Sequence, residues 1–171
     1  MAGHGNTRLM ERQSLDVPRD TRMVVVKTEW NPSIVDELEN GCIRTLKESG
    51  IHEPVVIAVP GAVEIPFMIR SYWESVKYSD ARPSAFIALG CVIKGETPHF
   101  EYVCQMVSQG VLQLNLTMSV PTVFGVLTVL DEAQARERLG GAHGHKGEEA
   151  ALTAISLVRT VTRLRFPERR P

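Results

Sequence analysis

The sequence predicts an α/β fold in which a four-stranded parallel sheet lies between two layers of helices. Short apolar runs rich in β-branched residues alternate four times with longer segments whose apolar residues recur at helical spacing. Proline, asparagine or glycine marks most of the boundaries between them. Such alternation is typical of a parallel sheet covered on both faces, which makes a three-layer α/β/α sandwich.

The length and composition indicate one soluble domain. The 171 residues favour a single domain at 21–166, with a flexible arm at 1–20 and a short tail at 167–171. A formal net charge of -1 does not favour nucleic acid or a membrane surface as a partner. No apolar run approaches the roughly 20 residues that span a bilayer. Three widely spaced cysteines are typical of a reducing compartment, so we expect a cytoplasmic protein.

The first half of the chain holds two strand–helix units. A β-branched run predicts the first strand at 23–26. Asn31 is the expected N-cap of the following helix, and Pro32 its first residue. The second strand is expected at 54–59, and a helix at roughly 66–76.

The third unit begins after a polar loop. Continuous apolarity predicts a strand at 85–93 that is buried on both faces. Thr97, as N-cap, and Pro98 then open a long helix. One stripe of this helix is apolar, and it consists of Phe100, Val103, Cys104, Val107, Val111 and Leu114.

The fourth unit completes the domain. The last strand is expected at 121–129, and Asp131 caps a short helix that runs through Leu139. A glycine-rich turn at 140–147 leads into a final helix that ends near Arg165.

Ligands of such sheets bind beyond the carboxyl ends of the strands, so the loops that follow the strands are the ones to inspect. In the loop 93–99, Gly95 allows close approach of a ligand, and the start of the helix favours an anion. His99 lies in the first turn, where its ordinary pKa near 6.5 suits proton transfer. The alternative is a capped helix with a surface histidine.

Two further side chains follow strands. Glu64 is suited to accept hydrogen bonds from a polyol, or else it only favours the dipole of the helix that follows. Trp30 is suited to stack on a flat heterocycle, or else it packs as a hydrophobic staple before Asn31. Phe124 lies within an apolar strand and, from the residues alone, is more often a core residue.

The glycine-rich turn carries charges but no known phosphate motif. Arg138 and Lys146 flank it as phosphate ligands or as solvated charges. A P-loop is excluded because His145, not glycine, precedes the lysine. His143 and His145 have no third ligand within reach, so no metal is expected. A Cys91–His99 nucleophile pair is disfavoured, because a thiol in a buried strand is usually inert.

Four segments together resemble the lumazine synthase family, the beta-subunit type of riboflavin synthase. They are VPGAVEIPF (59–67), ALGCVIKGETPHFEYV (88–103), VPTVFGVLTV (120–129) and HKGEEAALTAI (145–155). They occur in the family's order, and the resemblance covers roughly residues 22–160. It implies a flavodoxin-like sheet and no cofactor. It also implies a condensation of 5-amino-6-(D-ribitylamino)uracil with 3,4-dihydroxy-2-butanone 4-phosphate to 6,7-dimethyl-8-ribityllumazine in riboflavin biosynthesis.

The resemblance also implies roles for particular residues. His99 transfers a proton. The uracil substrate is bound by Trp30, Ala62, Val63, Glu64, Cys91, Val92, Ile93, Phe124 and Lys146. The ketose phosphate is bound by Glu96, Thr97 and Arg138.

The family's sites straddle subunits, so Phe124, Arg138 and Lys146 are expected from a neighbour in a homopentamer. Whether the pentamers build a 60-subunit shell stays open, because the turn reads GGAHGHKG at 140–147. Val63 departs from the family, which usually has an aromatic there. A non-catalytic flavin or lumazine carrier, or a shell protein with the same fold, is the alternative function.

Overall fold

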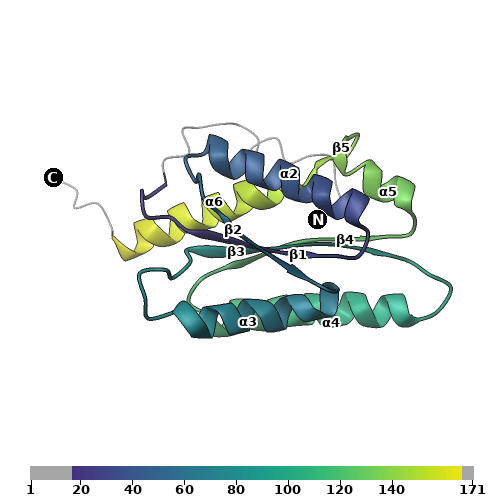
Figure 1. The fold of residues 1–171 in the computed structure, drawn as a ribbon, viewed down its shortest axis with the longest axis horizontal. Coiled ribbons are helices and arrows are strands. Elements are labelled where there is room, and N and C mark those ends of the chain that lie inside the picture. The colour runs from purple at the N-terminus through teal and green to yellow at the C-terminus, as the bar shows by residue number, and fades with distance from the viewer. Residues whose placement is uncertain (1–16, 167–171) are drawn as a thin grey trace.

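The computed structural model describes residues 17–166, and they form the three-layer sandwich that the sequence predicts (Figure 1). All neighbouring strands of its four-stranded sheet are parallel, in the order β2-β1-β3-β4. The strands are β1 (Met23–Thr28), β2 (Val55–Val59), β3 (Ala85–Ile93) and β4 (Thr122–Val129).

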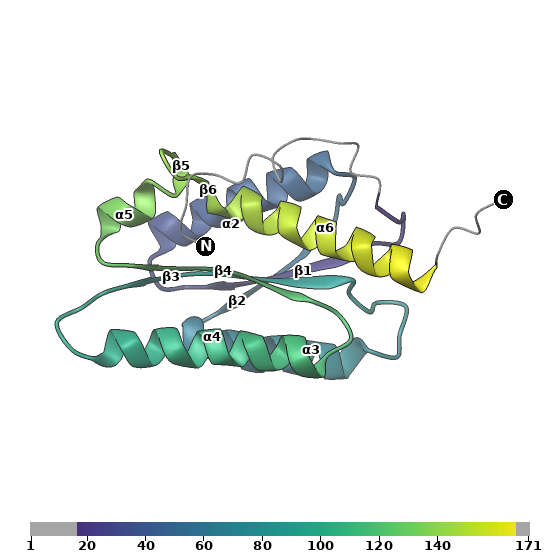
Figure 2. The same cartoon turned by 180° about the vertical axis from the view of Figure 1, so that it is seen from behind.

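Two helices cover each face of the sheet, as Figure 2 shows from behind. On one face lie α2 (Pro32–Glu48) and α6 (Lys146–Arg165), and on the other α3 (Ile65–Val76) and α4 (His99–Thr117). Each face has its own apolar core, because successive strand residues point to opposite faces. The predicted burial of the third strand is confirmed for 85–91, whereas Val92 and Ile93 are half-buried where the strand ends.

Glycines let α2 and α6 pack closely. A Cβ on Gly147 would lie 2.0 Å from the backbone oxygen of Leu38. A Cβ on Gly41 would lie 2.1 Å from Cε1 of His145, which is buried. The Nδ1 of His145 accepts a hydrogen bond from the backbone N–H of Glu148 at 3.4 Å, so this histidine caps α6.

One predicted helix cap is wrong, and another is confirmed in position but lacks a side-chain hydrogen bond. Asn31 is the N-cap residue of α2, as predicted, but its side chain makes no capping hydrogen bond and donates instead to the carbonyl of Cys91 at 2.9 Å. Thr97 lies outside α4, whose N-cap is Pro98 and whose first residue is His99. The fixed φ of proline already suits the helix, and the carbonyl of Pro98 accepts from the backbone N–H of Glu101 at 3.1 Å.

The segment 131–147 is more structured than predicted. Asp131 caps α5 as expected, since its carboxylate accepts from the backbone N–H of Gln134 at 2.8 Å. However, α5 (Glu132–Arg136) ends before Leu139. The expected glycine-rich turn holds a hairpin of β5 (Leu139–Gly141) and β6 (Gly144–His145), whose strands are too short to show alternation in the sequence.

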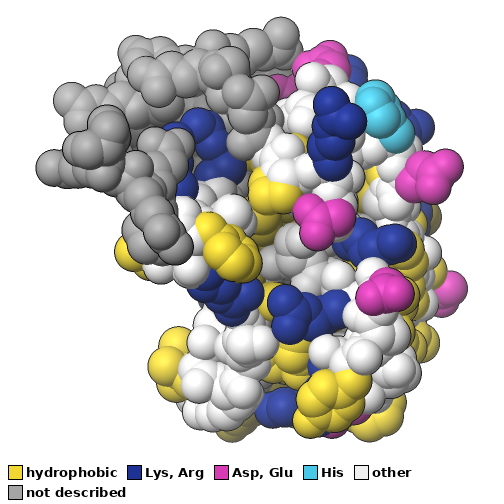
Figure 3. All heavy atoms as spheres, turned by 90° about the vertical axis from the view of Figure 1, so that its left-hand side faces the viewer, with side chains coloured by type: hydrophobic (Ala, Val, Ile, Leu, Met, Phe, Trp, Pro, Cys, Tyr) yellow, Lys and Arg dark blue, Asp and Glu magenta, His cyan; other side chains and the backbone are white. Residues whose placement is uncertain are grey.

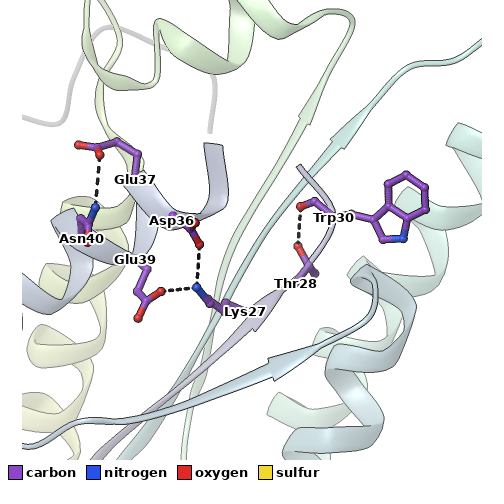
Figure 4. Close-up of polar contacts among 7 residues, drawn as sticks. All are labelled: Lys27, Thr28, Trp30, Asp36, Glu37, Glu39 and Asn40. Atoms are coloured by element: carbon purple, nitrogen blue, oxygen red, sulfur yellow. Dashed lines mark hydrogen bonds and ion pairs between the residues drawn. The ribbon is translucent and has the colours of Figure 1, made fainter. Parts of the chain in front are cut away.

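Lys27 is a charged residue on the α2 side of β1, with a side chain that is 19% exposed. Its ammonium lies 2.8 Å from Asp36 and 2.5 Å from Glu39 on α2 (Figure 4). These two hydrogen bonds raise the pKa of Lys27 above its ordinary value of 10.5. The cluster holds α2 over the sheet.

The chain ends lie partly outside the described residues. Of the arm expected at 1–20, only 17–20 are described, and Val17 packs against the core below α2 and α6. The tail expected at 167–171 lies outside, so both boundaries stay predictions. None of the helices between residues 17 and 166 has the length and apolarity to cross a membrane.

Candidate active site

A pocket of about 690 Å³ lies at the carboxyl ends of β1, β2 and β3, against the first turns of α4. Four segments line it, and they contribute Thr28, Trp30 and Asn31; Gly61, Ala62, Val63 and Glu64; Cys91, Val92 and Ile93; and His99, Tyr102, Val103 and Met106. The fold therefore brings together eight residues that were expected at one site, which are Trp30, Ala62, Val63, Glu64, Cys91, Val92, Ile93 and His99.

Trp30 presents its indole to this pocket. The residue is 72% exposed, so Trp30 is not the staple that packs before α2. The hydroxyl of Thr28 donates to the carbonyl of Trp30 at 3.5 Å, and the indole points away from the Lys27 cluster (Figure 4). An exposed indole at the mouth of a pocket is suited to stack on a planar ring.

Glu64 ends a 3₁₀ turn, η1 (Ala62–Glu64), that connects β2 to α3. Its carboxylate lies so close to Gly61 that a Cβ there would be 2.9 Å from Oε2. Glu64 makes no side-chain hydrogen bond or ion pair with any residue of the described range 17–166. Its acceptor positions are therefore available to donors of a ligand, such as hydroxyl groups.

His99 is exposed at the start of α4 and lines the pocket. Next to it is a smaller hollow of about 410 Å³, lined by Lys94, Glu96, Thr97, Pro98, Glu101, Tyr102 and Gln105. Two expected phosphate ligands, Glu96 and Thr97, thus lie beside the main pocket and not within it. Tyr102 lines both hollows, and His99, which lines the main pocket, directly follows Pro98 of the smaller one.

Several residues of these walls were missed from the sequence, and Tyr102, Met106 and Lys94 are among them. Tyr102 and Met106 lie three and seven positions after His99, a spacing that places them on the same helix face. That spacing was the available signal. Lys94 stands in the loop after β3, and its ammonium lies 3.7 Å from Glu101.

Comparisons with known proteins agree on one family. The family model described as 6,7-dimethyl-8-ribityllumazine synthase matches residues 20–162. A protein of that name from Porphyromonas gingivalis is 42% identical over 147 residues, which cover 85% of this chain and 88% of the relative. The protein of that name from Bacteroides fragilis is 43% identical over 136 residues, which cover 78% of this chain and 92% of the relative. The protein of that name from Streptomyces avermitilis is 37% identical over 171 residues, which cover 99% of this chain and 100% of the relative.

The chain belongs to the 6,7-dimethyl-8-ribityllumazine synthase family. It is therefore an enzyme of the transferase type that condenses its substrates. The family expected from the four sequence segments is confirmed, and so is the fold expected with it.

Three expected site residues lie outside both hollows. Arg138 donates through Nη1 to the carbonyl of Gln134 at 2.6 Å, and the ammonium of Lys146 lies 2.7 Å from Glu149. Phe124 is 42% exposed on the edge strand β4, so it is not a core residue. Within one chain these side chains do not line the pocket, and their entry from a neighbouring subunit stays a prediction.

Two of the three cysteines are buried thiols. Burial raises the pKa of the Cys91 thiol to about 11 and that of Cys42 to about 12, so both are protonated at neutral pH. Cys104 is only half-buried, and all three are free. Among residues 17–166 there is no group of three or more His, Cys, Asp and Glu placed to hold a metal ion.

A third hollow of about 680 Å³ lies at the opposite end of the sheet, where the strands begin. Figure 3 views this end and shows basic side chains around it. Arg22, Arg82 and Arg165 line the hollow, together with two aspartates. Helices end here, and cations are favoured at helix carboxyl ends. Arg165 also donates to the carbonyl of Ser119, just beyond α4, at 3.0 Å, so the fold itself accounts for this charge.

Proposed function

We propose that the chain condenses 5-amino-6-(D-ribitylamino)uracil with 3,4-dihydroxy-2-butanone 4-phosphate to 6,7-dimethyl-8-ribityllumazine, as a step in riboflavin biosynthesis. The observation that supports this most is the pocket that places Trp30, Glu64 and His99 around one space at the carboxyl ends of the strands. These groups suit a flat ring, a polyol and a proton transfer, and family membership adds the reaction type.

The ribitylamino-uracil fills the main pocket in this proposal. Its ring stacks on Trp30, and its ribityl hydroxyls donate to the carboxylate of Glu64, which has no side-chain partner among residues 17–166. The pyrimidine edge meets the end of β3, which continues to Ile93 although its pairing with β1 stops at Leu89. Where a strand extends beyond its neighbour, its backbone N–H and C=O groups on that side are available to a ligand, and a pyrimidine edge needs such donors and acceptors. Ala62 and Val63 close the side of the pocket.

The butanone phosphate lies at the adjoining hollow. Thr97 and the backbone of Glu96 border it, and the free N–H groups at the start of α4 favour an anion there. Lys94 lines the same hollow and adds a positive charge, although Glu101 shares it. In this arrangement the reacting carbon atoms lie between the two hollows, near His99 in the wall of the main pocket.

The reaction proceeds by addition and elimination. The 5-amino group of the uracil attacks the ketone, and loss of water gives an imine. Removal of a proton then allows the phosphate to leave, and ring closure with loss of a second water gives the lumazine. His99 moves the proton next to the departing phosphate, whereas much of the acceleration comes from holding both substrates together. The overall reaction involves no net oxidation or reduction, so it requires no redox cofactor.

The site is completed in a homo-oligomer. Large apolar side chains of α4 that are exposed in the single chain are Tyr102, Met106, Leu112 and Leu116. With the exposed Phe124 they support a subunit contact along this layer. In our proposal the neighbouring subunit of a pentamer supplies Phe124, Arg138 and Lys146, whether or not pentamers assemble into a shell of 60.

We also propose that the protein acts in the cytoplasm, because its cysteines are unpaired, as is usual in a reducing compartment.

His99→Ala tests the proposed chemistry. We expect turnover to fall by roughly 10²- to 10⁴-fold, because a general acid–base group contributes about that much, while some activity persists through orientation of the substrates. Lumazine formation is followed by fluorescence after subtraction of the spontaneous reaction, and thermal unfolding shows that the variant folds. Unchanged turnover would remove His99 from the mechanism.

Mixed oligomers test the shared site. Chains with His99→Ala and chains with Arg138→Ala are co-expressed, so that some pockets combine an intact histidine with an intact arginine from the neighbour. About a quarter of the sites are intact in a random mixture, so we expect activity well above that of either variant alone. A mixture no more active than the average of the two would place both residues in one subunit's site.

A further inference from the structure

We propose that Asn31 is a positioning residue that fixes the distance between Trp30 and the end of β3, and thereby the fit of the uracil ring. The inference rests on the proposed function. Asn31 is the one non-glycine residue between 17 and 166 with a positive φ, at φ 57 and ψ 53. This left-handed conformation is unfavourable for most side chains and least so for asparagine and aspartate.

The side chain of Asn31 joins two elements that no longer pair with each other. Its Nδ2 donates to the carbonyl of Cys91 at 2.9 Å. The last backbone pair between β1 and β3 is Lys27 with Leu89, so this hydrogen bond lies beyond the end of their ladder. It holds the turn after β1 against the part of β3 that lines the pocket.

The backbone of Asn31 is fixed as well. Its carbonyl accepts from the backbone N–H groups of Ile34 and Val35, each at 3.0 Å. One residue thus connects the start of α2, the turn after β1 and the end of β3. Trp30 directly precedes it, so a rotation at Asn31 moves the indole relative to Cys91. In the proposed complex the uracil ring lies between these two walls.

The consequence is specific to one substrate. Loss of the Asn31 amide widens or loosens the gap that receives the ring, but it leaves the hollow beside Thr97 unchanged. The KM for the ribitylamino-uracil is therefore expected to rise about 3- to 10-fold, the value of one hydrogen bond. The KM for the butanone phosphate and kcat stay within about twofold.

Three substitutions separate the roles of backbone and side chain. Asn31→Gly keeps the positive φ and removes the amide. Asn31→Asp keeps the conformation but sets a carboxylate oxygen against the Cys91 carbonyl, so it is expected to raise this KM at least as much. Asn31→Ala loses both features and lowers stability too. Asn40→Ala, at an exposed position of α2, is the matched control and is expected to match the wild type.

A readout without substrates distinguishes this inference from the proposed function. The chain has two tryptophans, so Trp73→Phe leaves Trp30 as the single indole emitter. Time-resolved fluorescence anisotropy is expected to show faster local motion of Trp30 after Asn31→Gly. Unchanged indole motion together with an unchanged uracil KM would overturn the inference, and so would an equal rise of both KM values. If the wild type does not form lumazine, the proposed function fails, while the anisotropy still tests Asn31.

Discussion

Gly61→Ala adds one methyl group at the wall between Trp30 and Glu64. The backbone there is extended, at φ -145 and ψ 179, so alanine adopts it without strain. The new Cβ would lie 2.9 Å from Oε2 of Glu64 and 3.7 Å from Cδ1 of Trp30. Ordinary contacts of a Cβ begin at 3.4 Å, so the carboxylate must move by about 0.5 Å while the indole stays.

The substitution is expected to separate binding from stability. A hydrogen bond to a charged group contributes about 1.5–3 kcal/mol, and a displaced carboxylate loses part of that. A loss of about 1 kcal/mol corresponds to a roughly fivefold rise in the KM for the ribitylamino-uracil. The free energy of unfolding is expected to be unchanged or higher by up to about 1 kcal/mol, because alanine restricts the unfolded chain more than glycine does.

The assay is steady-state kinetics with each substrate varied in turn, combined with urea unfolding. A double-mutant cycle with Glu64→Ala shows whether the methyl group acts through the carboxylate. We expect Gly61→Ala to have no further effect once Glu64 is alanine. An unchanged uracil KM in the single variant, or the same rise in the Glu64→Ala background, would refute the role given to this carboxylate.

Four other outcomes are expected. Arg138→Ala raises the KM for the butanone phosphate more than that for the uracil substrate, and equal effects in kinetics would contradict a phosphate contact. Gly147→Ala lowers the free energy of unfolding by about 3 kcal/mol or more in urea, because its Cβ would lie 2.0 Å from the Leu38 oxygen, and near-normal stability would contradict that packing. Lys27→Met lowers the free energy of unfolding by about 1 kcal/mol at pH 7. Because the pKa of Lys27 in the folded protein is raised above 10.5, this loss is expected to persist up to about pH 10.5 and to disappear as the pH rises through the folded pKa. A loss that is independent of pH would exclude the charge as its cause. Cys91, with a pKa of about 11, is expected to resist iodoacetamide at pH 8 until the chain unfolds, and rapid alkylation seen by mass spectrometry would show that the thiol is accessible.

The strands and the larger helices were predictable because their signals are local. Continuous apolarity at 85–93 marks a strand buried on both faces, and the structure confirms it for 85–91. The capping carboxylate of Asp131 also acts within its own turn, on Gln134. Such features depend on neighbours a few residues away, and these can be read directly from the chain.

The features that were missed depend on partners or neighbours that the residue type alone does not reveal. Asn31 has the residue type of a cap, but its amide partner is Cys91, 60 residues away, and only the fold brings the two together. Thr97 is not the N-cap of α4 as predicted, because the adjacent Pro98 occupies that position. In the candidate site, Tyr102 was missed although its spacing from His99 was visible, because only the folded helix shows which face borders the pocket.

Other parts of the site could be placed only by resemblance. Phe124 lies in an apolar strand, and nothing in its local sequence indicates that β4 is an edge strand on which this ring is exposed. Arg138 lies outside both hollows of the single chain and bonds to its own helix turn, so its contact with a phosphate stays a prediction. Sequence patterns predict the surroundings of a residue in its own chain far better than contacts across an interface.

The most direct test of the proposed reaction is to measure lumazine and inorganic phosphate in the same sample while the purified enzyme acts on both substrates. We predict that enzyme accelerates formation of both above the spontaneous rate, with one phosphate released per lumazine, and that omission of either substrate abolishes the acceleration. If the protein binds lumazine or riboflavin tightly but leaves both rates at the spontaneous level, the pocket serves a carrier, and the proposed synthase reaction is contradicted.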